Sequence, residues 1–170
     1  GMYQLVQELF KSLNEHPRLQ LRLLISVNEG FYAHISREFG VYFDFVFGKL
    51  TAGSYSEKLL ALRSMSFFLE NNTMKVLERF SEIMSCLLGN LDQLAAAPFD
   101  DRAANLFDEI MIVLELLVEN GESDNVEEFG FDLLRKLIQF VQNKSLNLNL
   151  RKLGLRVVSA QLTSHTIQPI

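Results

Sequence analysis

Residues 102–119, which read RAANLFDEIMIVLELLVE, decide the fold class of this chain. Apolar residues recur there three and four positions apart, as they do on one face of a helix. They cover most of the helix circumference, at Leu106, Phe107, Ile110, Met111, Val113, Leu114 and Leu117. A helix that is apolar on most sides must be buried on more than one side. This stretch therefore predicts a helix with packed neighbours around it.

The rest of the chain repeats this helical spacing between short interruptions. His16-Pro17, Gly30, Pro98 and the loop at residues 121–124 separate the segments, because proline and glycine typically end or begin helices. The predicted helices cover about residues 5–13, 17–30, 31–50, 54–70, 73–97, 102–119, 124–140 and 149–164. The pattern predicts roughly eight helices in four antiparallel pairs.

Two helix starts have the spacing of a capping box. Ser54 precedes Glu57 by three positions, and Asp124 precedes Glu127 by the same distance. In such a box the two residues satisfy each other's free backbone amides at the first turn. We therefore expect helices to begin at these two sites.

One segment also carries a competing strand pattern. Val41, Phe43, Phe45 and Phe47 alternate along the chain as in a half-buried strand. The only other alternating run covers residues 146–150, and a lone strand cannot satisfy its backbone hydrogen bonds. We therefore interpret both runs as helix or loop, with Phe39, Phe43 and Phe47 as a helical core stripe.

A short string recurs in the second helix of three of the predicted pairs. Residues 19–22, 60–63 and 153–156 all read Leu-x-Leu-Arg, at separations of 41 and 93 residues. The longer separation equals about two units of roughly 46 residues, within the range of helical-pair repeats. The missing copy falls at residues 106–109, where leucine is present and arginine is absent.

With this repeat, the chain resembles armadillo and HEAT-type repeat proteins over nearly all of its length. The resemblance implies an all-α fold, a right-handed α–α solenoid of about four helix pairs. It also implies a scaffold or adaptor that binds a partner segment on a curved face formed by the second helices. An irregular helical bundle is the alternative architecture, since leucine-rich tetrapeptides also arise by chance.

Composition indicates one folded domain inside the cell. The chain has 170 residues, 48% of them hydrophobic and 22% charged, with a net charge of −5 and a single cysteine, Cys86. We take Gly1, which precedes Met2, as a tag remnant and expect one domain over residues 2–170. One cysteine excludes an internal disulfide, and we find neither a secretory signal nor a membrane-spanning run. These features predict an intracellular protein, cytoplasmic or nuclear, that does not enter a membrane.

The sequence offers no motif for catalysis, a cofactor or a metal. His16, His34 and His165 lie in three separate segments, and no Cys/His spacing suits zinc. Cys86 has no cationic neighbour in sequence that would stabilise a thiolate, so we interpret it as a structural thiol. We therefore predict a non-enzymatic protein without a cofactor.

Charge distribution gives the one hint of a binding surface. Residues 100–132 contain eleven acids and a single base, whereas residues 133–170 contain six bases and no acid. The basic lobe could bind an acidic peptide or, as the alternative function, nucleic acid. The two blocks could equally attract each other, and the repeated arginines could merely extend from helix boundaries. The predicted partner-binding residues are Arg22, Arg63, Arg151, Lys152 and Arg156.

Overall fold

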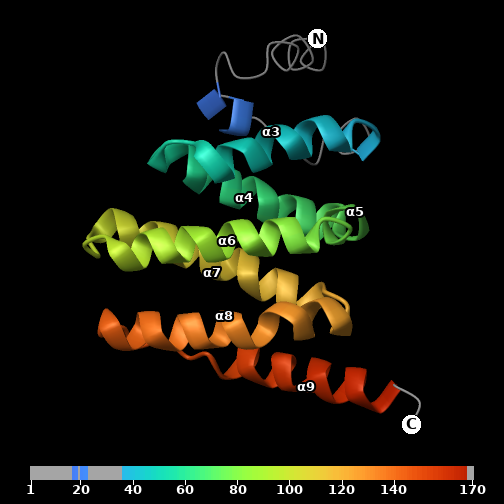
Figure 1. Ribbon diagram of the computed structural model, residues 1–170. Coiled ribbons are helices and arrows are strands. Elements are labelled where there is room, and N and C mark those ends of the chain that lie inside the picture. Colours follow the sequence, from blue (N-terminus) through green and yellow to red (C-terminus); the bar gives the residue numbers. More distant parts are fainter. Residues whose placement is uncertain (1–16, 19, 23–35, 168–170) are drawn as a thin grey trace. The chain divides into compact units, whose positions relative to one another are not determined.

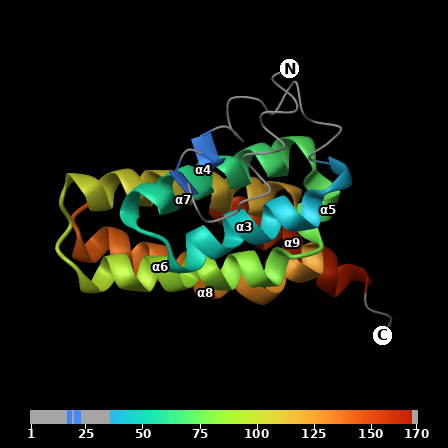
Figure 2. The same ribbon diagram turned by 90° about the horizontal axis from the view of Figure 1, so that it is seen from above.

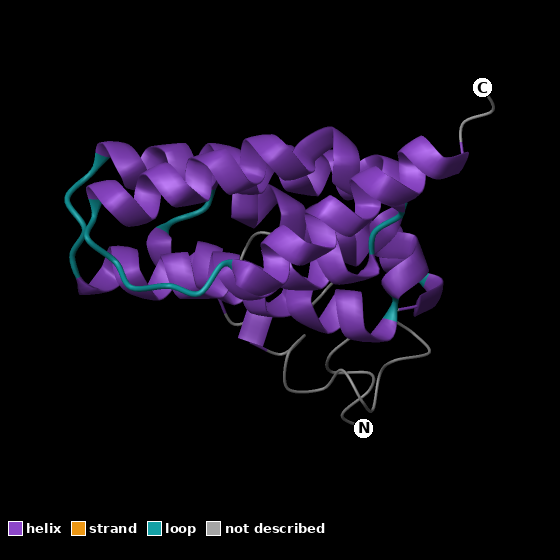
Figure 3. Cartoon of the chain, turned by 90° about the horizontal axis from the view of Figure 1, so that it is seen from below, coloured by secondary structure: helices purple, strands orange, loops and turns teal. Residues whose placement is uncertain are grey.

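The computed structural model describes residues 17–18, 20–22 and 36–167. Within these ranges the regular elements are α-helices joined by short loops, and no strand occurs there (Figure 3). The all-α prediction is therefore confirmed for this part of the chain. The predicted helix over residues 5–13 and most of the one over residues 17–30 lie outside it.

The helices fall into two compact units along the chain (Figure 1). The N-terminal unit covers Gly1–Val76 and the C-terminal unit covers Leu77–Ile170. The helices are α3 (Phe39–Ala52), α4 (Tyr55–Asn71), α5 (Thr73–Leu77), α6 (Phe80–Ala96), α7 (Asp101–Asn120), α8 (Ser123–Asn143) and α9 (Arg151–Ile167). The single domain expected over residues 2–170 stays a prediction.

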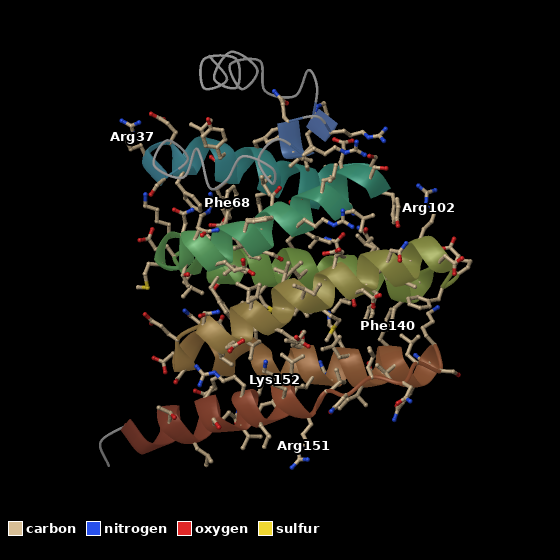
Figure 4. The ribbon with its side chains drawn as sticks, turned by 180° about the vertical axis from the view of Figure 1, so that it is seen from behind. Arg37, Phe68, Arg102, Phe140, Arg151 and Lys152 are labelled. Atoms are coloured by element: carbon tan, nitrogen blue, oxygen red, sulfur yellow. The ribbon has the colours of Figure 1, made fainter. Side chains whose placement is uncertain are left out.

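Aromatic rings hold α3 against α4 in the N-terminal unit. The ring of Phe39 lies 5.6 Å from that of Phe43 and meets Phe68 of α4 edge-on at 5.2 Å. Figure 4 shows Phe68 between these two helices. Phe43 and Phe47 stack at 5.8 Å, one helical turn apart. The segment is thus helical, and the competing strand pattern at residues 41–47 was misleading because residues at helical spacing form the core.

The capping box at Ser54 is confirmed. The Ser54 hydroxyl accepts a hydrogen bond from the Glu57 amide, and the Glu57 carboxylate accepts one from the Ser54 amide, both at 3.3 Å. Lys49 of α3 lies 3.4 Å from the same carboxylate. Burial raises the pKa of Glu57, but the hydrogen bonds from Ser54 and the Lys49 ammonium outweigh it, so the pKa lies below 4.5. The cap therefore stabilises the ionised carboxylate.

The prediction of one helix over residues 73–97 was wrong. α5 ends at Leu77 and α6 begins at Phe80, with a turn between them. Lys75 of α5 donates to the Ser36 carbonyl at 2.5 Å, whereas Phe80 of α6 packs against Phe129 at 6.1 Å. The two halves of the segment therefore pack against different neighbours, which explains the break.

In the C-terminal unit, two helical hairpins stack on each other. α6 contacts α7 and α8 contacts α9, while α6 also packs on α8 and α7 on α9. Figure 2 shows α8 beneath α6 and α9 beneath α7. The Phe107 and Phe140 rings stack at 4.7 Å, and Phe99 meets Phe140 edge-on at 5.6 Å. These rings join α7, α8 and the loop that precedes α7.

The helix predicted from residues 102–119 forms as α7 and is deeply buried. Its buried side chains are Ala103, Leu106, Phe107, Ile110, Val113, Leu114, Leu117 and Val118. α7 packs against α6 and α9, and its Phe107 ring also stacks on Phe140 of α8. The prediction that this helix has neighbours on more than one side is confirmed.

The predicted capping box at Asp124 was wrong. α8 already begins at Ser123, and its N-cap, Glu122, makes no side-chain capping hydrogen bond. Further along α8, Gly130 allows close contact with α9. A Cβ atom at Gly130 would lie 2.6 Å from Cγ1 of Val157, so glycine is required for this packing. This contact fixes the level at which α8 and α9 cross.

Candidate functional site

A groove of about 260 Å³ lies between α7 and α9 in the C-terminal unit. Val118, Leu153 and Leu155 give it apolar walls. Charged and polar groups border these walls, at Glu115, Glu119, Lys152, Arg156 and Ser159. We call this feature the α7/α9 groove. An apolar slot with a charged border can take an apolar side chain while its flanking residues stay in water.

Arg156 fastens α9 to the C-terminal end of α7. Its Nε donates to the Val118 carbonyl at 3.1 Å, and its second guanidinium nitrogen donates to the Gly121 carbonyl at 3.3 Å. The last carbonyls of a helix lack intrahelical partners and carry partial negative charge. The half-buried guanidinium therefore stabilises the end of α7 and forms one side of the groove. Electrostatic binding of a partner by the basic lobe would require an exposed Arg156, so its half-burial counts against that role for this residue.

Lys152 and Arg151 lie at the start of α9 and differ in their contacts. Lys152 Nζ lies 4.0 Å from a Glu119 carboxylate oxygen, and both side chains are exposed. Electrostatic binding of a partner by the basic lobe would require Lys152 to be unpaired with the acidic block, whereas it lies near Glu119, although such a surface pair contributes little. Arg151 is exposed and makes no side-chain ion pair within the described residues. Figure 4 shows it projecting away from the helices around it.

Other cations of the basic lobe also contact groups within the C-terminal unit. Lys136 lies 3.0 Å from Asp92, and Arg135 lies 2.6 Å from Asp132. Lys144 donates to the Ala97 carbonyl at 3.0 Å. The attraction between the two blocks stays a prediction, because Asp92 and Ala97 lie outside residues 100–132. Much of the basic charge is nevertheless balanced inside the unit. Less of it remains for an external partner.

The three arginines of the repeated string are divided between the two units. Arg22 and Arg63 are exposed residues of the N-terminal unit, whereas Arg156 belongs to the C-terminal unit. The surroundings of the repeated string also differ, because Leu62 is fully buried and Leu155 is 60% exposed. That Arg22, Arg63 and Arg156 bind a partner therefore stays a prediction.

Sequence reasoning missed the most unusual surface feature, a row of exposed apolar residues on α9. Leu155, Val158 and Leu162 are all exposed at helical spacing, while Leu153, Val157 and Ala160 form the buried stripe. A helix with apolar residues on two sides of its circumference signals contacts on two sides. That signal was present in the sequence of residues 153–162 and could have identified the surface.

The described residues form neither a metal-binding cluster nor a membrane-spanning helix. No group of three or more His, Cys, Asp or Glu side chains there is arranged to hold a metal ion. None of the helices described has the length and apolar character needed to span a bilayer. Cys86 is half-buried, with the Asn90 amide nitrogen 3.6 Å from its sulfur.

Comparison of the chain with protein-family models, curated proteins and solved structures found no match. The resemblance to armadillo and HEAT-type proteins therefore rests on the sequence pattern.

Proposed function

We propose that this protein is a non-catalytic protein-binding module that holds a partner segment in the α7/α9 groove. The observation that carries the proposal is the apolar lining of an open groove on a charged surface. Its wall residue Leu155 is 60% exposed, although it lies between the charged residues Lys152 and Arg156. Apolar surface left in contact with water lowers the free energy of binding when a partner covers it.

The size of the groove favours a side chain of a protein over a free metabolite. A volume of about 260 Å³ is below the ~300–1,000 Å³ of sites that enclose drug-sized ligands. A single leucine, methionine or phenylalanine from a partner segment suits it better, as the central anchor of a larger interface. The flanking surface then contributes most of the contact area.

The charges beside the groove favour acidic residues next to the anchor. Arg151 and Lys152 are exposed at the start of α9, where Arg151 can form charge-assisted hydrogen bonds with a carboxylate. Since most other cations of the basic lobe already contact acids or carbonyls, little charge remains to hold a long polyanion. This balance supports a protein partner over nucleic acid.

The packing order in the C-terminal unit supports the finer architecture that the repeat suggested. First helix lies on first helix and second on second, as α6 on α8 and α7 on α9. We propose that this unit is a short right-handed α–α solenoid of armadillo or HEAT type, with the groove on its layer of second helices. An extended partner segment can bind along such a layer of helices.

A displayed peptide library tests this function directly. Selection on the immobilised full chain is expected to enrich peptides with one bulky apolar residue beside aspartate or glutamate. For a selected peptide, Leu155→Asp should weaken the affinity measured by calorimetry at least ~10-fold, because a charge replaces the apolar wall.

Ile112→Asp provides the matched control for that experiment. Ile112 is also an exposed apolar residue, on α7, but it does not line the groove. This variant should bind the peptide like the unmodified chain. Equal losses in both variants, or peptides that bind Leu155→Asp unchanged, would exclude the groove as the binding site.

A further inference from the structure

We infer that the outward surface of the α8/α9 hairpin binds a second copy of this chain in a two-fold symmetric, antiparallel arrangement. This surface, the outer face, is defined by four exposed apolar residues outside the α7/α9 groove. They are Phe131 and Ile138 of α8, which are 52% and 48% exposed, and Val158 and Leu162 of α9, which are 48% and 64% exposed.

The close contact between Gly130 and Val157 places these residues side by side. A Cβ atom at Gly130 would lie 2.6 Å from Val157, so α8 and α9 are nearest each other at that level. Phe131 and Val158 each follow by one position and therefore share this level. Ile138 lies seven positions beyond Phe131, on the same side of α8. Phe131, Ile138 and Val158 thus lie on one surface across both helices, and Leu162 follows Val158 by about one helical turn on α9.

Charges of opposite sign lie in the two halves of the outer face. Asp124 and Glu128 are exposed near the N-terminal end of α8. Arg135 is exposed two turns further along α8, and Arg151 is exposed at the start of α9. Because α8 and α9 form a hairpin through residues 144–150, the start of α9 lies toward the C-terminal half of α8. The outer face is therefore acidic toward the start of α8 and basic toward the start of α9, with Phe131 and Val158 between these charges and Ile138 beyond Arg135.

Two basic residues of α8 contact Asp132 on the same helix. Arg135 pairs with Asp132 at 2.6 Å, and Lys136 lies 3.9 Å from the other Asp132 carboxylate oxygen. These contacts leave one hydrogen-bonding side of the Arg135 guanidinium available, since the group carries five donors.

A second copy fits this charge pattern better than a partner with charge of one sign. An antiparallel copy related by a two-fold axis places its acidic end on the basic end of the first, and the reverse contact follows by symmetry. A uniformly acidic or basic partner would meet like charge at one end of the face, which is unfavourable. The apolar residues meet at the centre, where water is excluded most completely.

The size of the face predicts a weak dimer. The paired helices overlap over about 25 Å, and two adjacent helices are about 20 Å wide, so each copy offers roughly 500 Å². Two copies then bury about 1,000 Å² in total, near the lower limit for a specific interface. We therefore expect dissociation constants in the micromolar range and dimers only at elevated concentration.

Sedimentation velocity of the full chain, from low to several hundred micromolar, measures this self-association. The unmodified chain should shift from monomer to dimer with rising concentration. Arg135→Glu with Arg151→Glu makes both ends acidic, and Asp124→Lys with Glu128→Lys makes both ends basic. Each double variant should dimerise at least ~10-fold more weakly, because like charges then face each other.

An equimolar mixture of the two double variants gives the decisive result. The acidic face of one then complements the basic face of the other, so heterodimers should form with at least the affinity of the unmodified chain. Circular dichroism of each variant confirms that it is folded before mixing. Because restored association requires folded partners, loss of folding cannot imitate this result.

Ser159→Arg separates this inference from the proposed function. The new side chain fills the α7/α9 groove and lies outside the four residues of the outer face, so peptide binding should fail while dimerisation stays unchanged. A chain that stays monomeric at every concentration would overturn the inference. So would a dimer that neither double variant weakens, or a mixture of the double variants that does not associate.

Discussion

α7 and α9 occupy equivalent positions as the second helices of neighbouring hairpins, yet they bury very different amounts of apolar surface. α7 buries apolar residues along its whole length, including Phe107, Ile110 and Leu114. Among the described side chains of α9, Leu153, Val157 and Ala160 are the buried apolar ones, while Leu155, Val158 and Leu162 are exposed. The difference follows from their neighbours, because α7 packs against α6 and α9 and its Phe107 stacks on Phe140 of α8, whereas the outward side of α9 carries exposed apolar residues.

This contrast separates residues that stabilise the fold from residues that can bind a partner. An apolar side chain that is buried contributes to the free energy of unfolding. One that stays exposed contributes little to stability, and its apolar surface lowers the free energy only after a partner covers it. Leucines of identical chemistry on α7 and α9 should therefore have different effects when they are removed.

The largest expected effect compares Leu114→Ala on α7 with Leu155→Ala on α9. Leu114 is fully buried, so its truncation should lower the free energy of unfolding by about 3 kcal/mol through lost contacts and a cavity. Leu155 is largely exposed, and its truncation should cost less than about 0.5 kcal/mol. Chemical denaturation of both variants measures the difference. Similar losses in the two variants would show that α9 is packed as tightly as α7.

Two glycine substitutions compare a closely packed helix contact with an open position. Gly130→Ala places a methyl group against the stiff, branched Val157 side chain and should destabilise the protein by about 1–3 kcal/mol. Gly89→Ala in α6 meets no atom within 4 Å and should stabilise it by about 0.5–1 kcal/mol, because alanine favours the helix. Thermal melting shows whether each variant is less or more stable than the unmodified chain. A stabilised Gly130→Ala variant would contradict the close α8/α9 packing.

Two helix starts also differ in how much one side chain stabilises them, with a smaller expected effect. Ser54 caps α4 through its side chain, whereas Ser123 is the first residue of α8 and the N-cap there has no side-chain cap. Ser54→Ala should cost about 1 kcal/mol, and Ser123→Ala should cost only a few tenths. Urea denaturation of the two variants provides the test. If Ser123→Ala proved the more costly change, the assigned start of α8 would be wrong.

The smallest expected effect is the pH dependence from Glu57. Its pKa in the folded protein lies below the ordinary value of 4.5, so the ionised carboxylate contributes stability that is complete above that value. The contribution is lost as the pH falls through the lowered folded pKa. The stability difference between the unmodified chain and Glu57→Gln should be less than about 0.5 kcal/mol at neutral pH and vanish in acid. A difference that grows as the pH falls would contradict the lowered pKa.

The sequence predicted features that depend on local spacing. The capping box at Ser54 and the buried helix at residues 102–119 were both correct, because each is determined by residues within a few turns of one another. The break at residues 78–79 was missed because it arises from distant partners. Lys75 contacts Ser36, whereas Phe80 contacts Phe129, and no local signal records these contacts.

The candidate site was predicted only in part. Lys152 and Arg156 were named from the repeat and the basic lobe, and both line the α7/α9 groove. Their roles differ from the expectation, since Arg156 binds two carbonyls at the end of α7 and Lys152 lies near Glu119. Helical spacing defines which residues share a face, but the identity of the neighbour that covers a face depends on tertiary packing.

Methyl-resolved NMR of the full chain with a selected peptide tests the central claim most directly. Val118, Leu153 and Leu155 line the α7/α9 groove, while Ile110 and Leu114 lie in the core of the same unit. Addition of the peptide should shift the methyl signals of the three groove residues progressively and saturate, with the core signals of α7 changing little. Saturable shifts that are confined to methyl groups outside the groove would contradict the account.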